Sequence, residues 1–334
     1  MDARTMNVAV FALSGSRDIG IRIAHGLGVD LADHEERAFE DGEHKARPLE
    51  PVRGRDVYVV HSLYGDDTHS ANDKLCRLLF FCGAVRDAGA RSVTAVAPYL
   101  CYARKDRKTK AFDPVTTRYV AQMVEAVGVH ALVTLEVHNL AAFQNAFRCP
   151  TVHLDARAPL IDALQPHLGD APVTVISPDA GGTKRAEAFR EALAARTGRQ
   201  AGSAFMEKYR SAGVVSGETL VGELDGRVAV ILDDLIASGG TMRRTAAKAR
   251  EQGVHAVYAV ATHGLFVEHA AEVVADPAFD AVLVTDSVPP FRLQGTPAEQ
   301  RVQVVPAGPT IGEALRRWQA GEPLETAGAA AGDA

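Results

Sequence analysis

The feature that most constrains this chain is the stretch of residues 228–241, Val-Ala-Val-Ile-Leu-Asp-Asp-Leu-Ile-Ala-Ser-Gly-Gly-Thr. Its apolar start predicts a buried strand, and residues 242–252 predict a helix. Gly239 and Gly240, between the two, allow the backbone to approach an anion closely. The start of a helix offers unpaired N–H groups and the positive end of its dipole. This strand–loop–helix order predicts a phosphate site at the end of a strand.

Polar side chains in the same stretch extend the prediction. Two adjacent carboxylates can accept hydrogen bonds from sugar hydroxyls or hold a metal-bound diol, and the hydroxyl groups can donate to a phosphate. A phosphate close to a vicinal diol describes ribose 5-phosphate. The predicted ribose 5-phosphate site consists of Asp233, Asp234, Ser238, Gly239, Gly240 and Thr241. The alternative is that the acids and glycines form only a loop and a helix cap.

The bulk properties exclude several other classes of protein. The chain has 334 residues, of which 47% are hydrophobic and 23% charged, as expected for two globular domains. A net charge of −6 argues against non-specific binding of nucleic acid. No apolar run reaches the roughly 18 residues of a membrane helix, and the N-terminus lacks a signal pattern. The four cysteines show no CxxC pairing. We therefore expect a cytoplasmic protein with no membrane or nucleic-acid partner.

Apolar runs alternate with amphipathic stretches along the whole chain. Strands are predicted at residues 8–13, 57–62, 92–97, 132–135, 173–177, 228–232, 255–262 and 281–285. Helices are predicted at residues 19–27, 71–88, 113–127, 183–196 and 242–252. This alternation indicates parallel sheets covered by helices on both faces. We expect an α/β protein with two tandem domains, residues 1–150 and 151–324, and a disordered tail at residues 325–334.

Further motifs accompany the ribose 5-phosphate loop. They are Phe-Glu-Asp-Gly-Glu at 39–43, Arg-Lys-Asp-Arg-Lys at 104–108, Glu-Val-His at 136–138, Pro-Asp-Ala-Gly-Gly at 178–182 and Lys-Tyr-Arg at 208–210. In this order they resemble the ribose-phosphate pyrophosphokinase (phosphoribosyl pyrophosphate synthetase) family. The chain departs from the family pattern at Lys105, where glutamine is usual, at Glu136, where aspartate is usual, and at Ala237, where an acid is common.

The resemblance implies a fold of two tandem phosphoribosyltransferase-like domains, each a mainly parallel sheet flanked by helices. It also implies an enzyme for nucleotide biosynthesis, which transfers the β,γ-diphosphoryl group of ATP to the C1 hydroxyl of ribose 5-phosphate. The products are phosphoribosyl pyrophosphate and AMP. Family members are homodimers or assemblies of dimers, so a homo-oligomer is expected.

The resemblance assigns a role to each motif. It implies ATP-binding residues Phe39, Asp41, Glu43, Arg104, Lys105, Asp106 and His138. It implies a pyrophosphate loop of Asp179, Ala180, Gly181 and Gly182. His138 and Asp179 would hold Mg²⁺. Lys208 and Arg210, at the start of a segment with the composition of a mobile lid, would be catalytic.

Two alternatives stay open at this stage. A phosphoribosyltransferase shares the ribose-phosphate loop, although it does not require the motifs at 39–43 and 104–108. A non-catalytic, regulatory homologue of the synthetase is the other, and the departures at Lys105, Glu136 and Ala237 favour it. ATP binding and product formation discriminate between these alternatives and the enzyme.

Overall fold

The computed structural model describes residues 7–211 and 214–322, and the tail predicted at 325–334 lies outside them. The described residues form two compact units. Unit 1 contains residues 7–155 and 307–322, and unit 2 contains residues 156–306. The chain thus returns to unit 1 through α9 (Gly308–Gln319), a segment that the predicted boundary assigned to the second domain.

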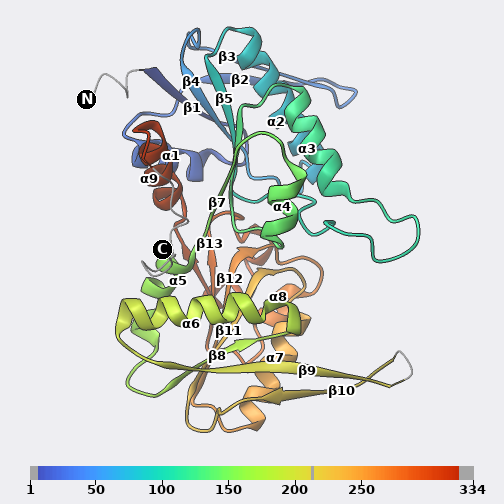
Figure 1. Cartoon of the computed structure of the whole chain (residues 1–334), viewed down its shortest axis with the longest axis vertical. Helices are drawn as coiled ribbons and strands as arrows, with labels where there is room; N and C mark the ends of the chain where they lie inside the picture. Colours follow the sequence, from blue (N-terminus) through green and yellow to red (C-terminus); the bar gives the residue numbers. More distant parts are fainter. Residues whose placement is uncertain (1–6, 212–213, 323–334) are drawn as a thin grey trace. The chain divides into compact units, whose positions relative to one another are not determined.

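Unit 1 is built on a five-stranded parallel sheet in the order β1-β4-β5-β6-β7 (Figure 1). Its strands are β1 (Val8–Ala12), β4 (Asp56–Val60), β5 (Ser92–Ala97), β6 (Ala131–Leu135) and β7 (Thr151–Leu154). Its other helices are α1 (Arg17–Leu27), α2 (Ala71–Asp87), α3 (Thr116–Ala126) and α4 (Leu140–Ala146). β1 and β6 are buried along their whole length, which explains their continuous apolar sequences.

A separate antiparallel hairpin, β2 (His34–Ala38) and β3 (His44–Pro48), completes unit 1. Its strands are rich in charged residues and are only partly buried. The sequence pattern therefore gave no strand signal here, and the hairpin is an addition to the predicted fold. Residues 39–43 form its turn.

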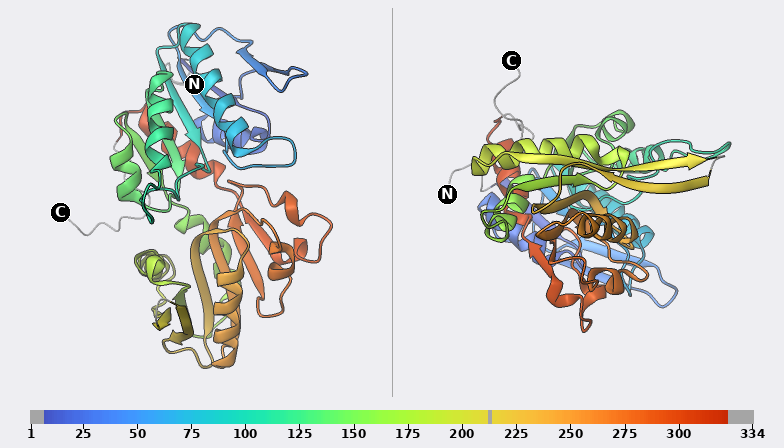
Figure 2. Two further views of the ribbon diagram at one scale, coloured as in Figure 1. Left: turned by 90° about the vertical axis from the view of Figure 1, so that its right-hand side faces the viewer. Right: turned by 90° about the horizontal axis from the view of Figure 1, so that it is seen from below.

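Unit 2 contains a seven-stranded sheet in the order β10-β9-β8-β11-β12-β13-β14. All neighbours are parallel except β9 and β10, which form a long hairpin at one side of the sheet (Figures 1 and 2). The strands are β8 (Val173–Ser177), β9 (Ala201–Ser211), β10 (Val214–Val221), β11 (Val228–Ile236), β12 (Ala256–Gly264), β13 (Ala281–Thr285) and β14 (Val302–Val305).

Four α-helices and four short 3₁₀ turns accompany this sheet in the described part of unit 2. The helices are α5 (Arg157–Leu164), α6 (Thr183–Thr197), α7 (Gly240–Glu251) and α8 (Ala270–Val274). The turns are η2 (Gln165–His167), η3 (Ala180–Gly182), η4 (Phe291–Leu293) and η5 (Glu299–Arg301). The predicted α/β class, with parallel sheets and alternating helices, is confirmed. Across the described ranges, no helix is both long and apolar enough to cross a membrane.

Helix α9 packs directly against α1 through glycines. A Cβ placed on Gly312 would lie 2.4 Å from the carbonyl oxygen of Ile23 and 2.8 Å from Cα of Gly26. A real Cβ atom does not approach other atoms so closely. The backbones of α1 and α9 can therefore touch only because Gly312 and Gly26 carry no side chain. This contact packs α9 against α1 of unit 1.

One predicted helix start is wrong. We expected Asp113 to cap a helix beginning at Pro114, whereas α3 begins at Thr116 and Val115 is its N-cap. The Asp113 carboxylate instead accepts hydrogen bonds from the hydroxyl and N–H of Thr109 and from the N–H of Lys110. Asp113 therefore closes the preceding loop, and short-range sequence rules do not distinguish this role from a cap.

Candidate active site

The predicted ribose 5-phosphate loop lies between β11 and α7. Gly239 is the N-cap of α7 and has φ = +76°, in the left-handed region that favours glycine. A Cβ at this position would also lie 2.8 Å from Cγ1 of Val273. α7 begins at Gly240, two residues earlier than predicted. The glycine pair thus opens the helix and exposes its first N–H groups, as an anion site requires.

Asp233 and Asp234 lie within β11, which is longer than predicted. Their side chains are 24% and 5% exposed, respectively. The N–H of Asp234 donates to Oδ1 of Asp233 at 2.9 Å. Burial and the neighbouring Asp234 raise the pKa of Asp233 to about 7, although Arg185 opposes the shift. The pKa of Asp233 therefore lies above the ordinary range of an aspartate, because burial and the adjacent acid disfavour the charged form.

The predicted pyrophosphate loop follows β8, the parallel neighbour of β11. The side chain of Asp179 caps η3 by accepting a 2.9 Å hydrogen bond from the N–H of Gly182. The hydroxyl of Ser177 donates to the carbonyl of Asp179 at 2.6 Å. Because β8 and β11 are adjacent and parallel, this loop and the ribose 5-phosphate loop lie at the same edge of the sheet, where open α/β sheets bind ligands.

Lys208 and Arg210 lie on β9, in the long hairpin of unit 2. Their backbones pair with Glu218 and Val215 of β10. A register shift falls between Val215 and Gly217, opposite this segment. The side chains of Lys208 and Arg210 lie outside the description, so their catalytic role stays a prediction.

In unit 1 the motif at 39–43 forms the turn of the β2–β3 hairpin. The N–H of Phe39 donates to the carbonyl of Glu43 at 2.8 Å, and Oδ1 of Asp41 accepts from the N–H of Glu43 at 3.0 Å. Phe39 is 37% exposed, and the Arg37 guanidinium lies 5.1 Å from the centre of its ring. An exposed aromatic ring with nearby carboxylates is a suitable surface for a nucleobase.

The other two motifs of unit 1 lie at the carboxyl ends of β5 and β6. Nδ2 of Asn139 donates to Oδ2 of Asp106 at 2.7 Å, and Asn139 also caps α4. His138 and Arg104 are exposed. Since β5 and β6 are parallel neighbours, their loops meet at one edge of the sheet. The structure thus brings the basic loop and the histidine motif together, and their binding of a triphosphate stays a prediction.

The three departures from the family pattern have identifiable surroundings. Nζ of Lys105 lies 3.2 Å from Oδ2 of Asp113, and hydrogen bonds from Thr109 hold the pKa of Asp113 well below its ordinary range. Glu136 has φ = +34°, which is rare for a residue with a side chain. Ala237 is half-buried, and its carbonyl accepts from the N–H of Val267 at 3.1 Å.

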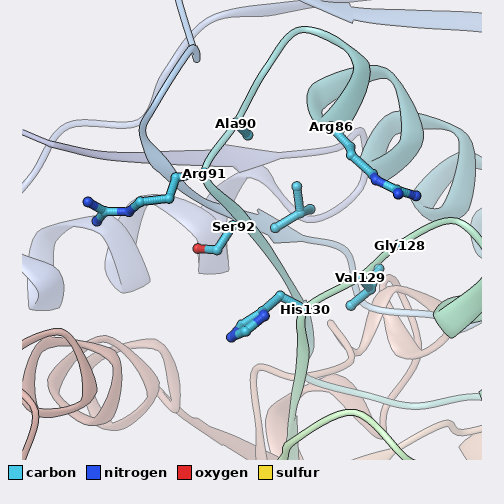
Figure 3. A pocket seen from close by; sticks show the side chains of 8 residues that line it. Arg86, Ala90, Arg91, Ser92, Gly128, Val129 and His130 are labelled. Carbon is cyan, nitrogen blue, oxygen red and sulfur yellow. The ribbon is translucent and has the colours of Figure 1, made fainter.

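A hollow of about 380 Å³ lies elsewhere in unit 1, at the amino ends of β5 and β6 (Figure 3). Arg86, Arg91 and His130 line it, and the two guanidinium groups extend in opposite directions. Arg91 is engaged by Asp56. This hollow is therefore distinct from the candidate site, whose motifs all lie at carboxyl ends of strands or in hairpins.

The structure adds two residues that the predicted site did not include. Asn139 joins the basic loop after β5 to the histidine motif after β6, and Arg185 contacts both acids of the predicted ribose 5-phosphate loop. Both residues stand beside predicted motifs in the sequence, and this proximity was the only available signal. Asp106 is 33 residues from Asn139 in the sequence, and Asp233 is 48 residues from Arg185.

Two α/β units built on parallel sheets, the second with glycine-rich loops at the carboxyl ends of the neighbouring strands β8 and β11, are typical of a phosphoribosyltransferase-like class of protein. Comparison with known proteins narrows this class. Residues 8–128 match the N-terminal domain of ribose phosphate pyrophosphokinase, and residues 211–326 match the phosphoribosyl synthetase-associated domain. The chain belongs to the ribose-phosphate pyrophosphokinase family, so the resemblance drawn from its motifs is confirmed.

Relatives and a solved structure agree with this assignment over nearly the whole chain. A ribose-phosphate pyrophosphokinase of Hyphomonas neptunium is 33% identical over 92% of this chain and 95% of its own length. One from Enterococcus faecalis is 33% identical over 94% of each chain. The crystal structure of phosphoribosylpyrophosphate synthetase from Mycobacterium smegmatis superposes with a TM-score of 0.83 at 27% identity, and covers 94% of this chain and 99% of that one. The predicted fold of two phosphoribosyltransferase-like domains is confirmed.

Proposed function

We propose that this protein is a ribose-phosphate diphosphokinase for nucleotide biosynthesis. It transfers the β,γ-diphosphoryl group of ATP to the C1 hydroxyl of ribose 5-phosphate and gives phosphoribosyl pyrophosphate and AMP. The observation that carries this proposal is that one chain of this family has loops suited to a triphosphate and a loop suited to a sugar phosphate. Unit 1 has the joined loops of Asp106 and Asn139, and unit 2 has the ribose 5-phosphate loop.

ATP is proposed to bind the loops of unit 1. The exposed ring of Phe39 would stack on the adenine, with Asp41 and Glu43 as hydrogen-bond acceptors. Arg104, Lys105 and His138 would contact the phosphates, and Asp106 would be held in place by Asn139. Clustered cations of this kind offset the charge of a triphosphate.

Ribose 5-phosphate is proposed to bind the loop of unit 2. The carboxylates of Asp233 and Asp234 would accept hydrogen bonds from its two ring hydroxyls. The N–H groups at the start of α7, with the hydroxyls of Ser238 and Thr241, would bind the 5-phosphate. The loop of residues 179–182 would receive the transferred diphosphate beside the sugar, because β8 and β11 are neighbours.

Mg²⁺ is the proposed cofactor. Among residues 7–211 and 214–322 no group of three or more His, Cys, Asp or Glu side chains forms a metal cage. Mg²⁺ usually binds one or two carboxylates together with substrate phosphates, so it requires no such cage. Asp179 is half-buried and His138 exposed, and each of these two residues would offer Mg²⁺ a ligand at the loop of its own unit. When bound, it would neutralise phosphate charge and lower the pKa of the sugar hydroxyl.

The proposed reaction is an in-line displacement at the β-phosphorus of ATP. O1 of the sugar forms a bond to this phosphorus and releases its proton to solvent, and the bond from the β-phosphorus to the bridging oxygen breaks, so that AMP leaves with this oxygen on its phosphate. Since both substrates are anionic, positioning and neutralisation of charge would supply most of the catalysis. Lys208 and Arg210 are proposed to stabilise the charge that develops on the diphosphoryl group in the transition state.

The exposed hairpin of Phe39 also supports the proposal that the protein is a homo-oligomer, in which this hairpin contributes to a neighbour's nucleotide site. A cytoplasmic location is proposed because both substrates and the product belong to nucleotide metabolism. The oligomeric state is tested by sedimentation of the purified full chain. A monomer that retains full activity would contradict the proposed role of the hairpin.

The identity of the transferred group tests the proposed function. ³¹P NMR of a mixture of protein, ATP, Mg²⁺ and ribose 5-phosphate is expected to show a diphosphate attached to C1 of the sugar. A product that carries a single new phosphate, with release of ADP, would contradict diphosphoryl transfer. Binding of ATP and ribose 5-phosphate without product would support the regulatory alternative, and failure to bind ATP would support the phosphoribosyltransferase.

A further inference from the structure

Arg185 contacts both acids of the ribose 5-phosphate loop. It lies in the first turn of α6, and its Nη1 is 3.4 Å from Oδ1 of Asp233 and 3.5 Å from Oδ1 of Asp234. β8 ends at Ser177, level with Leu232 in the register of the two strands. The two acids therefore project beyond the end of β8, where a side chain from α6 can reach them.

Arg185, Asp233 and Asp234 form a largely buried cluster, in which the contact affects the charges of both acids. The side chains of Arg185, Asp233 and Asp234 are 18%, 24% and 5% exposed. Two adjacent carboxylates in such a place repel one another and disfavour ionisation. A guanidinium group between them reduces this repulsion, and solvent screens the interaction less than it does at the surface.

The geometry differs from that of a structural ion pair on the same helix. Arg196 forms a fork with Asp162, in which Nε and Nη2 donate to the two carboxylate oxygens at 2.8 and 2.6 Å. Arg185 instead shares one nitrogen between Oδ1 atoms of two carboxylates, at the long end of hydrogen-bonding distances. Such an arrangement lets one guanidinium nitrogen orient both acids at once.

Arg185 is also close to the neighbouring loop. A Cβ placed on Gly182 would lie 3.8 Å from Nη1 of Arg185 and 3.7 Å from Oδ1 of Asp179. The guanidinium group thus adjoins both the loop of residues 179–182 and the paired acids. A residue in this position can fix the acids relative to the loop that is proposed to receive the diphosphate.

We infer that Arg185 is a positioning residue for the sugar, which holds Asp233 and Asp234 turned to one side so that both can accept hydrogen bonds from the hydroxyls of ribose 5-phosphate. This inference rests on the proposed function, because it assumes that the paired acids bind the sugar. It assigns Arg185 no contact with the reacting atoms.

Equilibrium binding measured by calorimetry tests this inference. In Arg185→Gln, the affinity for ribose 5-phosphate is expected to fall about tenfold, the effect of losing a charged hydrogen bond. The affinity for inorganic phosphate, which requires only the helix N-terminus, should change less than about twofold. Arg185→Lys keeps the charge but not the planar group. Its affinity for ribose 5-phosphate should lie between that of the wild type and that of Arg185→Gln. The KM for ATP should stay unchanged.

Arg196→Gln is the matched control, because it removes an ion pair from the same helix at an exposed position. It should leave both affinities unchanged. A double-mutant cycle supplies the second test. In the Asp233→Asn/Asp234→Asn background, Arg185→Gln should change the affinity for ribose 5-phosphate less than about twofold, because residues in direct contact are coupled.

The outcomes separate the inference from the proposed function. If the wild type binds ribose 5-phosphate and forms product while Arg185→Gln binds it equally well, the inference is wrong and the function stands. Two other results would also overturn the inference. One is that Arg185→Gln loses affinity equally for ribose 5-phosphate and inorganic phosphate. The other is that Arg185→Gln lowers the affinity for ribose 5-phosphate tenfold in the Asp233→Asn/Asp234→Asn background as well. If the wild type binds ribose 5-phosphate but forms no product, the proposed function fails and the binding comparison still decides the role of Arg185.

Discussion

Nδ2 of Asn139 donates a 2.7 Å hydrogen bond to Oδ2 of Asp106. This bond joins the basic loop after β5 to the histidine motif after β6. The Oδ1 atom of Asn139 accepts from the N–H of Ala142 and so caps α4. One side chain therefore sets the start of a helix and the distance between two loops that are proposed to bind the phosphates of ATP.

We predict that Asn139→Ala raises the KM for ATP about tenfold, because the charged acceptor Asp106 loses its donor. It should also reduce the free energy of unfolding by about 1 kcal/mol through loss of the cap. Asn139→Ser is the control, since serine retains the cap but is too short to reach Asp106. An equal KM for ATP in the wild type and Asn139→Ala would contradict this prediction.

The raised pKa of Asp233 predicts a pH dependence of sugar binding. With burial and Asp234 raising the pKa of Asp233 to about 7, the acid is mostly neutral at pH 6 and mostly ionised at pH 8. Only the ionised form accepts through both oxygens. We therefore expect kcat/KM for ribose 5-phosphate to fall as the pH drops below about 7.

The phosphate of the substrate also titrates, near pH 6, and a variant separates the two groups. The fall in kcat/KM at low pH has one contribution from Asp233 and one from the phosphate of the substrate. In Asp233→Asn the first contribution should disappear and the second should remain. A profile that keeps the same midpoint in Asp233→Asn would exclude this carboxylate as the titrating group.

The catalytic prediction concerns Lys208. Lys208→Ala should lower kcat by about 10²–10³-fold, the range observed when one stabilising donor of a transition state is removed. The KM for ribose 5-phosphate should change little. Lys248→Ala is a suitable control, because Lys248 forms an exposed ion pair with Glu251 on α7. An unchanged kcat in Lys208→Ala would remove this residue from the mechanism.

The contact between α1 and α9 predicts a large effect on stability. Gly312→Ala should lower the free energy of unfolding of unit 1 by about 1–3 kcal/mol, because the added methyl group overlaps the backbone of α1. Gly83 lies in α2 with open space around it, so Gly83→Ala should instead stabilise by about 0.5–1 kcal/mol. Thermal unfolding of both variants measures these changes, and a Gly312→Ala protein as stable as the wild type would contradict the packing.

The strands that are buried on both faces of a sheet were predicted most accurately from the sequence. β5, β8 and β13 begin and end at the predicted residues, because apolar strands of a covered parallel sheet stand out from their surroundings. The β2–β3 hairpin was missed because its strands are half-exposed and charged. The strands β9 and β10 were missed for a related reason, since residues 207–217 have the composition of a loop.

The motifs predicted candidate site residues, whereas contacts between distant segments could not be predicted from the sequence. Asp233 and Arg185 were both visible as charged residues in glycine-rich motifs, but only the fold shows that one guanidinium serves both acids. Likewise, the sequence does not show why α9 contains glycine, because the reason is its close contact with α1 in the fold. Tertiary packing of this kind follows from neither propensity nor periodicity.

Formation of AMP tests the central claim most directly. Purified full-length protein is incubated with ATP and Mg²⁺, and AMP is measured with and without ribose 5-phosphate. We predict that AMP forms only when ribose 5-phosphate is present, in amounts equal to the phosphoribosyl pyrophosphate produced. AMP release that is independent of the sugar, or no AMP although both substrates bind, would contradict the assignment as a ribose-phosphate diphosphokinase.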